Sequence, residues 1–229
     1  MNSERTFSLG LISIVIAIIL FGFVFLTTAQ QGATVTPGTP ETWSGPSPGS
    51  TTAEGGNITE VNMSGVSQTI HWQGFWGQVS GSIALKDASN NTMYNWTVAT
   101  VSGNVYTSND STGITWSNLM EGDDSDCDNI VGTGADSCTN TFGPSTKTFT
   151  VAGSDITTVP IVQTFNYTGS GTFDEGILED SGGSGPWVYV ATIYNNANTF
   201  KNGAADFQMI VPVNGTNTVT YYFWLELGV

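Results

Sequence analysis

The stretch Trp187-Val-Tyr-Val-Ala-Thr-Ile-Tyr194 decides the fold class of this chain. Apart from one Ala, its residues are aromatic or β-branched, which favours a strand whose side chains point alternately to two faces. Both faces of such a strand would be largely apolar, which is typical of the centre of a sheet that is covered on both sides. The stretch therefore predicts a central strand with a β domain built around it.

Shorter runs of the same kind recur on both sides of this strand. They cover residues 69–72, 79–85, 93–98, 159–167, 207–213 and 219–227. In residues 79–85, Val79, Ile83 and Leu85 alternate with small or polar residues, which predicts a half-buried strand. No stretch after Thr27 has a convincing helical period. We therefore expect an all-β ectodomain over residues 57–229, arranged as a β-sandwich of Ig-like or Greek-key type.

The start of the chain has a different composition, because residues 9–26 are uncharged and apolar apart from Ser13. These eighteen residues, as a helix rising ~1.5 Å per residue, would span ~27 Å, just enough to cross the core of a bilayer. Residues 1–30 are therefore expected to be an N-terminal transmembrane anchor or a signal segment. In the second case cleavage after Ala29 would release a secreted domain.

Residues 31–56 are expected to form a disordered stalk. Of the 25 residues from 32 to 56, 19 are Pro, Gly, Ser or Thr. Such a segment buries too little apolar surface to offset the entropy cost of ordering the chain. The same composition suits a plain linker and an O-glycosylated stalk.

Charge and sequons both place the bulk of the chain outside a cell. After residue 30 there are 18 acidic residues and three basic ones, so nucleic acid, which needs clustered cations, is not an expected partner. Asn-x-Ser/Thr sequons make N-glycosylation an expectation, although a chain this rich in Asn, Ser and Thr also produces them by chance. The sequon asparagines are Asn57, Asn62, Asn90, Asn95, Asn109, Asn166 and Asn214.

The two cysteines of the chain, Cys127 and Cys138, are expected to form a disulfide, as an isolated pair outside a cell usually does. Acidic residues surround them, and alternate acidic positions can converge on one calcium ion. Calcium is therefore a candidate cofactor, and the simpler alternative is a solvated acidic loop. The candidate ligands are Asp123, Asp124, Asp126, Asp128 and Asp136.

No enzyme is expected from this sequence. His71 is the only histidine and has no Gly-x-Ser-x-Gly motif nearby, so a nucleophilic triad is not indicated. A second acidic group is expected at an exposed hairpin tip, although paired carboxylates also occur in metal sites and in glycoside hydrolases. That group is Asp174, Glu175, Glu179 and Asp180.

An aromatic cluster at residues 71–77 offers a candidate ligand site. Trp72, Phe75 and Trp76 stand beside glycines and could stack on sugar rings, whereas most such residues in a β domain belong to its core. Both interpretations remain open from the sequence.

Four segments carry a resemblance to a known group of proteins. Asn-Ile-Thr-Glu-Val-Asn at 57–62, the runs at 72–81 and 91–96, and the ending at 220–227 resemble archaeal cell-surface β-rich proteins of the envelope. The apolar start is also pilin-like, although Leu9 precedes Gly10 where archaeal pilins usually carry Lys or Arg. The resemblance implies an archaeal envelope and supplies no catalytic residues.

These observations together predict a membrane-anchored, N-glycosylated cell-surface protein with a structural or adhesive role, as an envelope-layer or filament subunit. The alternative is an extracellular calcium- or carbohydrate-binding recognition module, and a hydrolase is a weaker third hypothesis. Expected partners are the membrane through the N-terminal helix, further copies of the chain or other envelope proteins, and glycans.

Overall fold

The computed structural model describes residues 30–98, 100–143, 145–180, 186–215 and 217–228. Within these ranges antiparallel strands dominate and the helices are short, so the expected all-β class is confirmed. The predicted anchor, residues 1–30, lies outside the described residues except for Gln30. Among the residues that the structure does describe, no helix is long and apolar enough to cross a membrane.

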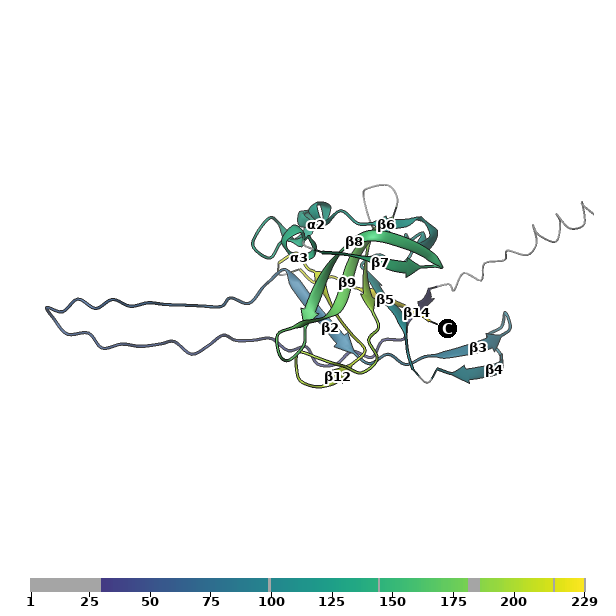
Figure 1. Cartoon of the computed structure of the whole chain (residues 1–229), viewed down its shortest axis with the longest axis horizontal. Coiled ribbons are helices and arrows are strands. Elements are labelled where there is room, and N and C mark those ends of the chain that lie inside the picture. Colours follow the sequence, from purple (N-terminus) through teal and green to yellow (C-terminus); the bar gives the residue numbers. More distant parts are fainter. Residues whose placement is uncertain (1–29, 99, 144, 181–185, 216, 229) are drawn as a thin grey trace, which may run out of the picture.

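The elements follow one another as short strands with one helical region in the middle (Figure 1). They are β1 (Gln31–Gly32), β2 (Trp72–Gly77), β3 (Ser82–Lys86), β4 (Thr92–Thr97), β5 (Gly103–Ser108), the 3-10 turn η1 (Trp116–Asn118), β6 (Leu119–Glu121), α2 (Asp124–Val131), α3 (Cys138–Phe142), β7 (Ser145–Val151), β8 (Ser154–Phe165), β9 (Gly171–Asp180), β10 (Trp187–Thr192), β11 (Ala197–Asn198), β12 (Ala204–Ala205), β13 (Phe207–Pro212) and β14 (Tyr222–Leu227).

Strand β10 lies inside the largest sheet, as its sequence predicts. The order of that sheet is β1-β14-β5-β10-β9-β8-β7, with β6 paired to β9, and neighbouring strands are antiparallel. Val188 and Val190 of β10 belong to one buried cluster, whereas Tyr189 and Ala191 belong to the other. The alternation of the strand therefore sends side chains into an apolar core on each face.

Different elements cover the two faces of this sheet. On the Tyr189 face, β13 contributes Met209 and Val211, and the helical region contributes Val131 and Phe142. On the Val190 face, Trp116 of η1 packs on a cluster formed by strands of the same sheet, in which Phe149 of β7 and Val159 of β8 join the valines of β10. The sheet is thus enclosed by segments that lie far from β10 in the sequence.

The β3–β4 hairpin differs from what residues 79–85 predict. Val79 is buried, but it lies before the strand, and every residue of β3 and β4 is exposed. The two strands pair only with each other and form a sheet separate from the main one. Figure 1 shows them projecting from the domain. The alternating pattern correctly predicts a strand, but the predicted half-burial is wrong because no sheet face covers it.

Residues 33–71 contain no helix or strand, although paired strands flank them on both sides. Before them, β1 pairs with β14, and the Ala33 N–H donates to the Phe223 carbonyl at 2.9 Å. After them the chain enters β2, and Figure 1 shows the segment running out from the domain and back. The predicted stalk, residues 31–56, stays a prediction, and its first two residues belong to the main sheet.

Candidate functional site

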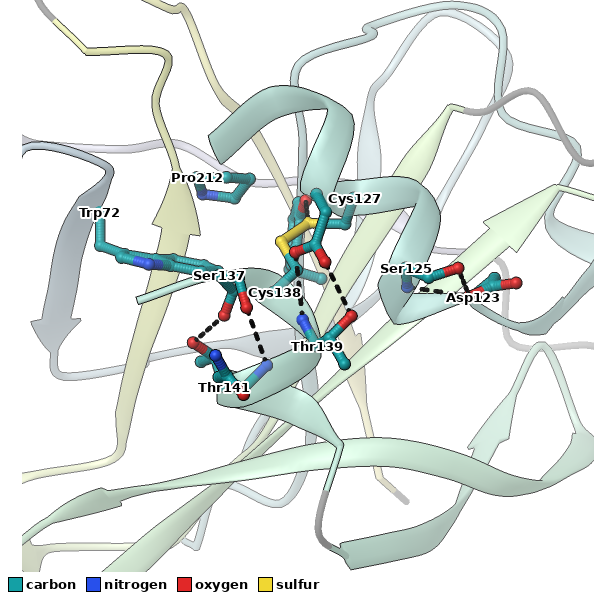
Figure 2. Close-up of a disulfide and its surroundings, with 12 residues drawn as sticks. Trp72, Asp123, Ser125, Cys127, Ser137, Cys138, Thr139, Thr141 and Pro212 are labelled. Carbon is teal, nitrogen blue, oxygen red and sulfur yellow. Dashed lines mark hydrogen bonds between the residues drawn. A yellow bond between two sulfur atoms is a disulfide. The ribbon is translucent and has the colours of Figure 1, made fainter. Parts of the chain in front are cut away.

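The disulfide joins the two helices of the chain's helical region. The Cα atoms of Cys127 and Cys138 are 5.7 Å apart, an ordinary separation for a disulfide. Both residues are fully buried in the cluster that covers the main sheet. Figure 2 shows the bond between α2 and α3, with Trp72 and Pro212 of the neighbouring strands beside it. The disulfide therefore holds together the two helices that pack over the core of the main sheet.

These two helices form although no stretch after Thr27 has a convincing helical period. Asp123 caps α2 by accepting a 2.8 Å hydrogen bond from the Ser125 N–H, and Ser137 caps α3 by accepting one of 3.1 Å from the Asn140 N–H. Such caps satisfy the free N–H groups of a first turn. Helices of eight and five residues are too short to show a clear apolar period.

The acidic residues of this region lie on or beside α2. Asp128 accepts hydrogen bonds from the N–H and Oγ1 of Thr139, at 3.2 and 2.8 Å, and so ties α2 to α3. Burial and the charges of Asp123 and Asp128 raise the pKa of Asp124. Side chains two positions apart on a helix point ~200° away from each other around the helix axis. The carboxylates of Asp124, Asp126 and Asp128 therefore do not all converge on one point.

Calcium binding by these residues stays a prediction. In the described ranges, no group of three or more His, Cys, Asp or Glu side chains is placed to hold a metal ion.

Asp136, the fifth candidate ligand, links this loop by hydrogen bonds to the segment before β2 and to the first residue of β2. Its carboxylate accepts a 2.6 Å hydrogen bond from Thr69 Oγ1 and lies 3.2 Å from His71 Nδ1, and its carbonyl accepts one of 2.6 Å from Trp72 Nε1. The hydrogen bonds from Thr69 and His71 hold the pKa of Asp136 below its ordinary value. The strand expected over residues 69–72 begins only at Trp72.

The order of Thr69, Asp136 and His71 in this hydrogen-bonded group differs from that of a nucleophilic triad. In a triad the imidazole stands between the hydroxyl and the carboxylate, so that it can take the hydroxyl proton. Here the carboxylate of Asp136 stands between Thr69 and His71. The arrangement ties the loop that carries Asp136 to the segment before β2.

Two of the three candidate aromatic ligands are half-buried against the core. The ring of Trp72 lies 6.0 Å from that of Phe142, and the ring of Phe75 meets that of Phe223 edge-on at 5.3 Å. Core packing, the simpler of the two sequence interpretations, therefore describes Trp72 and Phe75.

Trp76 points elsewhere and forms an exposed aromatic pair. Its side chain is 44% exposed, and its ring meets that of Phe200, itself 47% exposed, edge-on at 5.6 Å. Lys201 Nζ lies 5.9 Å from each ring centroid and bonds the carboxylate of Glu41. Sequence reasoning missed Phe200 and Lys201, because they lie more than a hundred residues from Trp76.

The second acidic group is not a hairpin tip. Asp174, Glu175 and Glu179 are buried in β9, which pairs with β8 on one side and with β10 on the other, and Asp180 is half-buried at its end. Their flanking glycines suggested a turn, but Gly171 and Gly176 are themselves strand residues.

Asp174 belongs to a polar cluster on one face of the sheet. It accepts hydrogen bonds from Lys147 Nζ at 2.6 Å, from Gln163 Nε2 at 2.7 Å and from the Tyr194 hydroxyl. Burial favours the neutral acid, but the hydrogen bonds from Lys147, Tyr194 and Gln163 outweigh it and lower the pKa of Asp174. Sequence reasoning missed this cluster, although Lys147 is one of only three Lys or Arg residues after residue 30 and could have pointed to it.

Glu175 points to the opposite face and lies fully buried between β9 and β13. Its Oε2 accepts a 2.7 Å hydrogen bond from the Ile210 N–H, while Oε1 has no hydrogen-bond partner among the described residues. Burial raises the pKa of Glu175 well above its ordinary value, and the single hydrogen bond from Ile210 offsets this only in part. Burial thus favours the neutral, protonated form of Glu175 in the layered core.

The sequon asparagines lie mostly on the surface. Asn166 is half-buried, and its Oδ1 accepts hydrogen bonds from the N–H groups of Thr168 and Ser170. The exposed ones are Asn57, Asn62, Asn90, Asn95, Asn109 and Asn214. Asn95, whose modification depends on the direction of its side chain in β4, is among them.

Comparison with known proteins returns no relative. No protein-family model, no curated protein and no solved structure matches this chain.

Proposed function

We propose that this protein is a membrane-anchored, N-glycosylated cell-surface protein with a structural or adhesive role in an archaeal envelope. The observation that carries the proposal is the exposure of six of the seven sequon asparagines, of which Asn95 lies in β4 and the others lie in loops and in the segment before β2. A transferred glycan needs an asparagine that the enzyme can reach and that solvent can surround. The buried disulfide fits the same oxidising location.

The finer part of this proposal concerns the architecture. We take the domain to be a β-sandwich in which β2 and β13 supply part of the second layer over the Tyr189 face. Strands β7 to β10 form a meander whose last strand, β10, lies beside the earlier strand β5. This order supports a variant of a Greek-key arrangement. Sandwich domains of this kind commonly serve as rigid units of cell surfaces.

The experiment that tests the proposal is electron microscopy of the native protein, extracted from its host membrane with calcium present. Ordered filaments or a lattice would support the role of an envelope subunit. Dispersed single particles would contradict that role. Calcium is kept in the buffer so that removal of a bound ion cannot be the cause of dispersion.

Glycosylation is tested separately by peptide mass spectrometry of protein from the same host. Asn90→Gln should remove one glycan, whereas Asn91→Gln, on the neighbouring residue, should leave it because the sequon of Asn90 needs only Thr92 at its third position. Unmodified peptides at all of the exposed sequons would contradict this part of the proposal.

A second candidate function is carbohydrate recognition at the exposed Trp76–Phe200 pair. Exposed aromatic faces with a nearby cation and carboxylate, here Lys201 and Glu41, are suited to stack on a sugar ring and to bond its hydroxyls. A glycan-array screen of the native protein should then give signals that Trp76→Ala abolishes and that Trp43→Ala, also at an exposed tryptophan, retains. Equal signals from both variants would exclude this site.

A further inference from the structure

The exposed β3–β4 hairpin is an amphipathic ribbon. Its register places Ile83 opposite Trp96 and Leu85 opposite Tyr94. Opposed residues in an antiparallel pair share a face, and positions two apart along a strand share it too. The four side chains therefore line one face, on which the rings of Tyr94 and Trp96 lie 4.8 Å apart. We name these four residues the hairpin face; they are between 38% and 59% exposed.

The opposite face of the same ribbon is small and polar. Ser82 is paired with Thr97, and Ala84 with Asn95. Asn95 carries a sequon, so a glycan there would leave from the side away from Tyr94 and Trp96. Apolar contact on one face and modification on the other are therefore compatible.

The hairpin emerges at the end of β14 that also contacts Gln30, the first described residue. Gly81, just before β3, packs so closely on Leu227 of β14 that a Cβ on it would lie 2.3 Å from Leu227 Cδ1. At the same end of β14, Gln30 Nε2 donates to Glu226 Oε2 at 3.1 Å. Figure 1 shows β3 and β4 projecting on the side of the domain where β1 and β14 lie.

The hairpin also lies in a long stretch of the chain that carries almost no charge. Between residues 61 and 109 the charged side chains are Lys86 and Asp87, which cancel, whereas the whole chain has a net charge of −15. An acidic surface is repelled by anionic lipid headgroups, and a neutral one is not. The hairpin region can thus approach a membrane without electrostatic cost; residues 181–225, where the charged side chains are Lys201 and Asp206, share this property.

We propose that the hairpin face lies in the interfacial region of the bilayer that holds the N-terminal segment, and so orients the domain on the membrane. This inference rests on the proposed membrane anchor. Residues 26 and 30 are separated by at most ~14 Å of extended chain, so the anchor keeps the hairpin close to the lipid. Tyr and Trp beside aliphatic residues are the side chains that favour this zone. Water there can also bond the unpaired edges of a two-stranded ribbon.

The test is a fluorescence experiment on the full chain in vesicles of palmitoyl-oleoyl phosphatidylcholine. Leu85→Cys and, as the matched control on the opposite face of the same strand, Ala84→Cys are each labelled with an environment-sensitive nitrobenzoxadiazole dye. Both positions are exposed, and the two natural cysteines are bonded to each other. We expect the dye at 85 to shift to the blue and to be quenched several-fold more by nitroxide lipids than the dye at 84.

Flotation of the vesicles separates failure of this inference from failure of the anchor. Protein that floats while both dyes stay in water would overturn the hairpin contact and leave the anchor intact. Protein that does not float would overturn both. A dye at 85 that is shielded only at high protein concentration, without lipid quenching, would show contact with a second copy and would also overturn the proposal.

Discussion

Strand β10 and the β3–β4 hairpin have similar residues and opposite surroundings. Both contain alternating aliphatic, aromatic and small side chains. In β10 the four central residues are buried, whereas every residue of β3 and β4 is exposed. The difference arises from what reaches each strand: β10 has paired neighbours and a cover on both faces, while β3 and β4 have only each other.

Local pattern therefore predicts the strand, and distant segments decide its burial. The cover on the Tyr189 face comes from β13 and from helices that the disulfide joins. Neither the hairpin face nor β10 contains in its own residues the information about which segments will pack on it. Whether an apolar strand face is buried thus depends on its surroundings. Where no segment of the chain packs on such a face, an external surface can cover it.

The largest expected effect is a matched pair of leucine truncations. Leu178 of β9 is fully buried, and Leu85 of β3 is 51% exposed. We expect Leu178→Ala to lower the free energy of unfolding by about 3 kcal/mol, because it removes buried methyl groups and leaves a cavity. Leu85→Ala should cost less than about 0.5 kcal/mol, as a surface substitution does. Denaturant unfolding of the detergent-solubilised chain measures both.

The contrast between the two regions would be refuted if Leu178→Ala and Leu85→Ala lowered the free energy of unfolding by the same amount. A Leu85→Ala loss above about 2 kcal/mol in detergent would mean that the hairpin is buried in the protein itself. Leu85→Ala that is neutral in detergent but weakens vesicle contact would sharpen the comparison.

Removing the disulfide tests the cover of the main sheet. We expect Cys127→Ser with Cys138→Ser to lower the free energy of unfolding by about 3 kcal/mol, because the loop between two cysteines 11 positions apart is no longer closed in the unfolded state. Thermal unfolding with and without reductant is the measurement. Reductant should lower the melting temperature of the natural protein and leave that of the double variant unchanged; a drop in the variant as well would refute the assignment.

Sequence reasoning succeeded where the information was local. The central position of residues 187–194 and the pairing of the only two cysteines follow from residue type and number. It failed for the helices, because α3 has five residues and depends on the cap that Ser137 provides. A cap is a single hydrogen bond, which leaves no period in the sequence.

The candidate sites show the same limit. Acidic residues between glycines suggested an exposed tip, whereas Asp174 meets Lys147 across 27 positions of sequence and Glu175 meets Ile210 across 35. The Trp76–Phe200 pair and the Asp136–His71 contact likewise join distant segments. The sequence identifies several of the residues in these contacts, but only the fold determines which of them lie next to one another.

The Lys147–Asp174 pair should stabilise the sheet over a defined pH range. The lowered pKa of Asp174 gives stability that is present above about pH 3.8 and lost as the pH falls through the folded-state value. Burial lowers the pKa of Lys147, but hydrogen bonds to Asp174 and Tyr194 outweigh it and raise the net value; that stability is present below about pH 10.5 and lost as the pH rises further.

Lys147→Met should therefore cost about 1–2 kcal/mol between those limits and less outside them, because it leaves the carboxylate of Asp174 without its cation. Lys86→Met, on the hairpin, is the control and should cost little at any pH. Melting temperatures across the pH range measure the effect, and equal losses in the two variants would remove the distinction between sheet and hairpin.

The smallest expected effect concerns the carboxyl group of Glu175, whose pKa is raised by burial in the core. Its folded-state pKa is raised, so above about pH 4.5 the unfolded chain releases a proton that the folded chain keeps, and stability falls as the pH rises. Glu175→Gln has nothing to ionise and keeps an oxygen that can accept from the Ile210 N–H. We expect it to stabilise the protein by about 1 kcal/mol near neutral pH and to change little near pH 4. Glu121→Gln, at an exposed position of β6, should show no such trend. A gain for Glu175→Gln that does not grow with pH would mean that the carboxyl is ionised within the folded core.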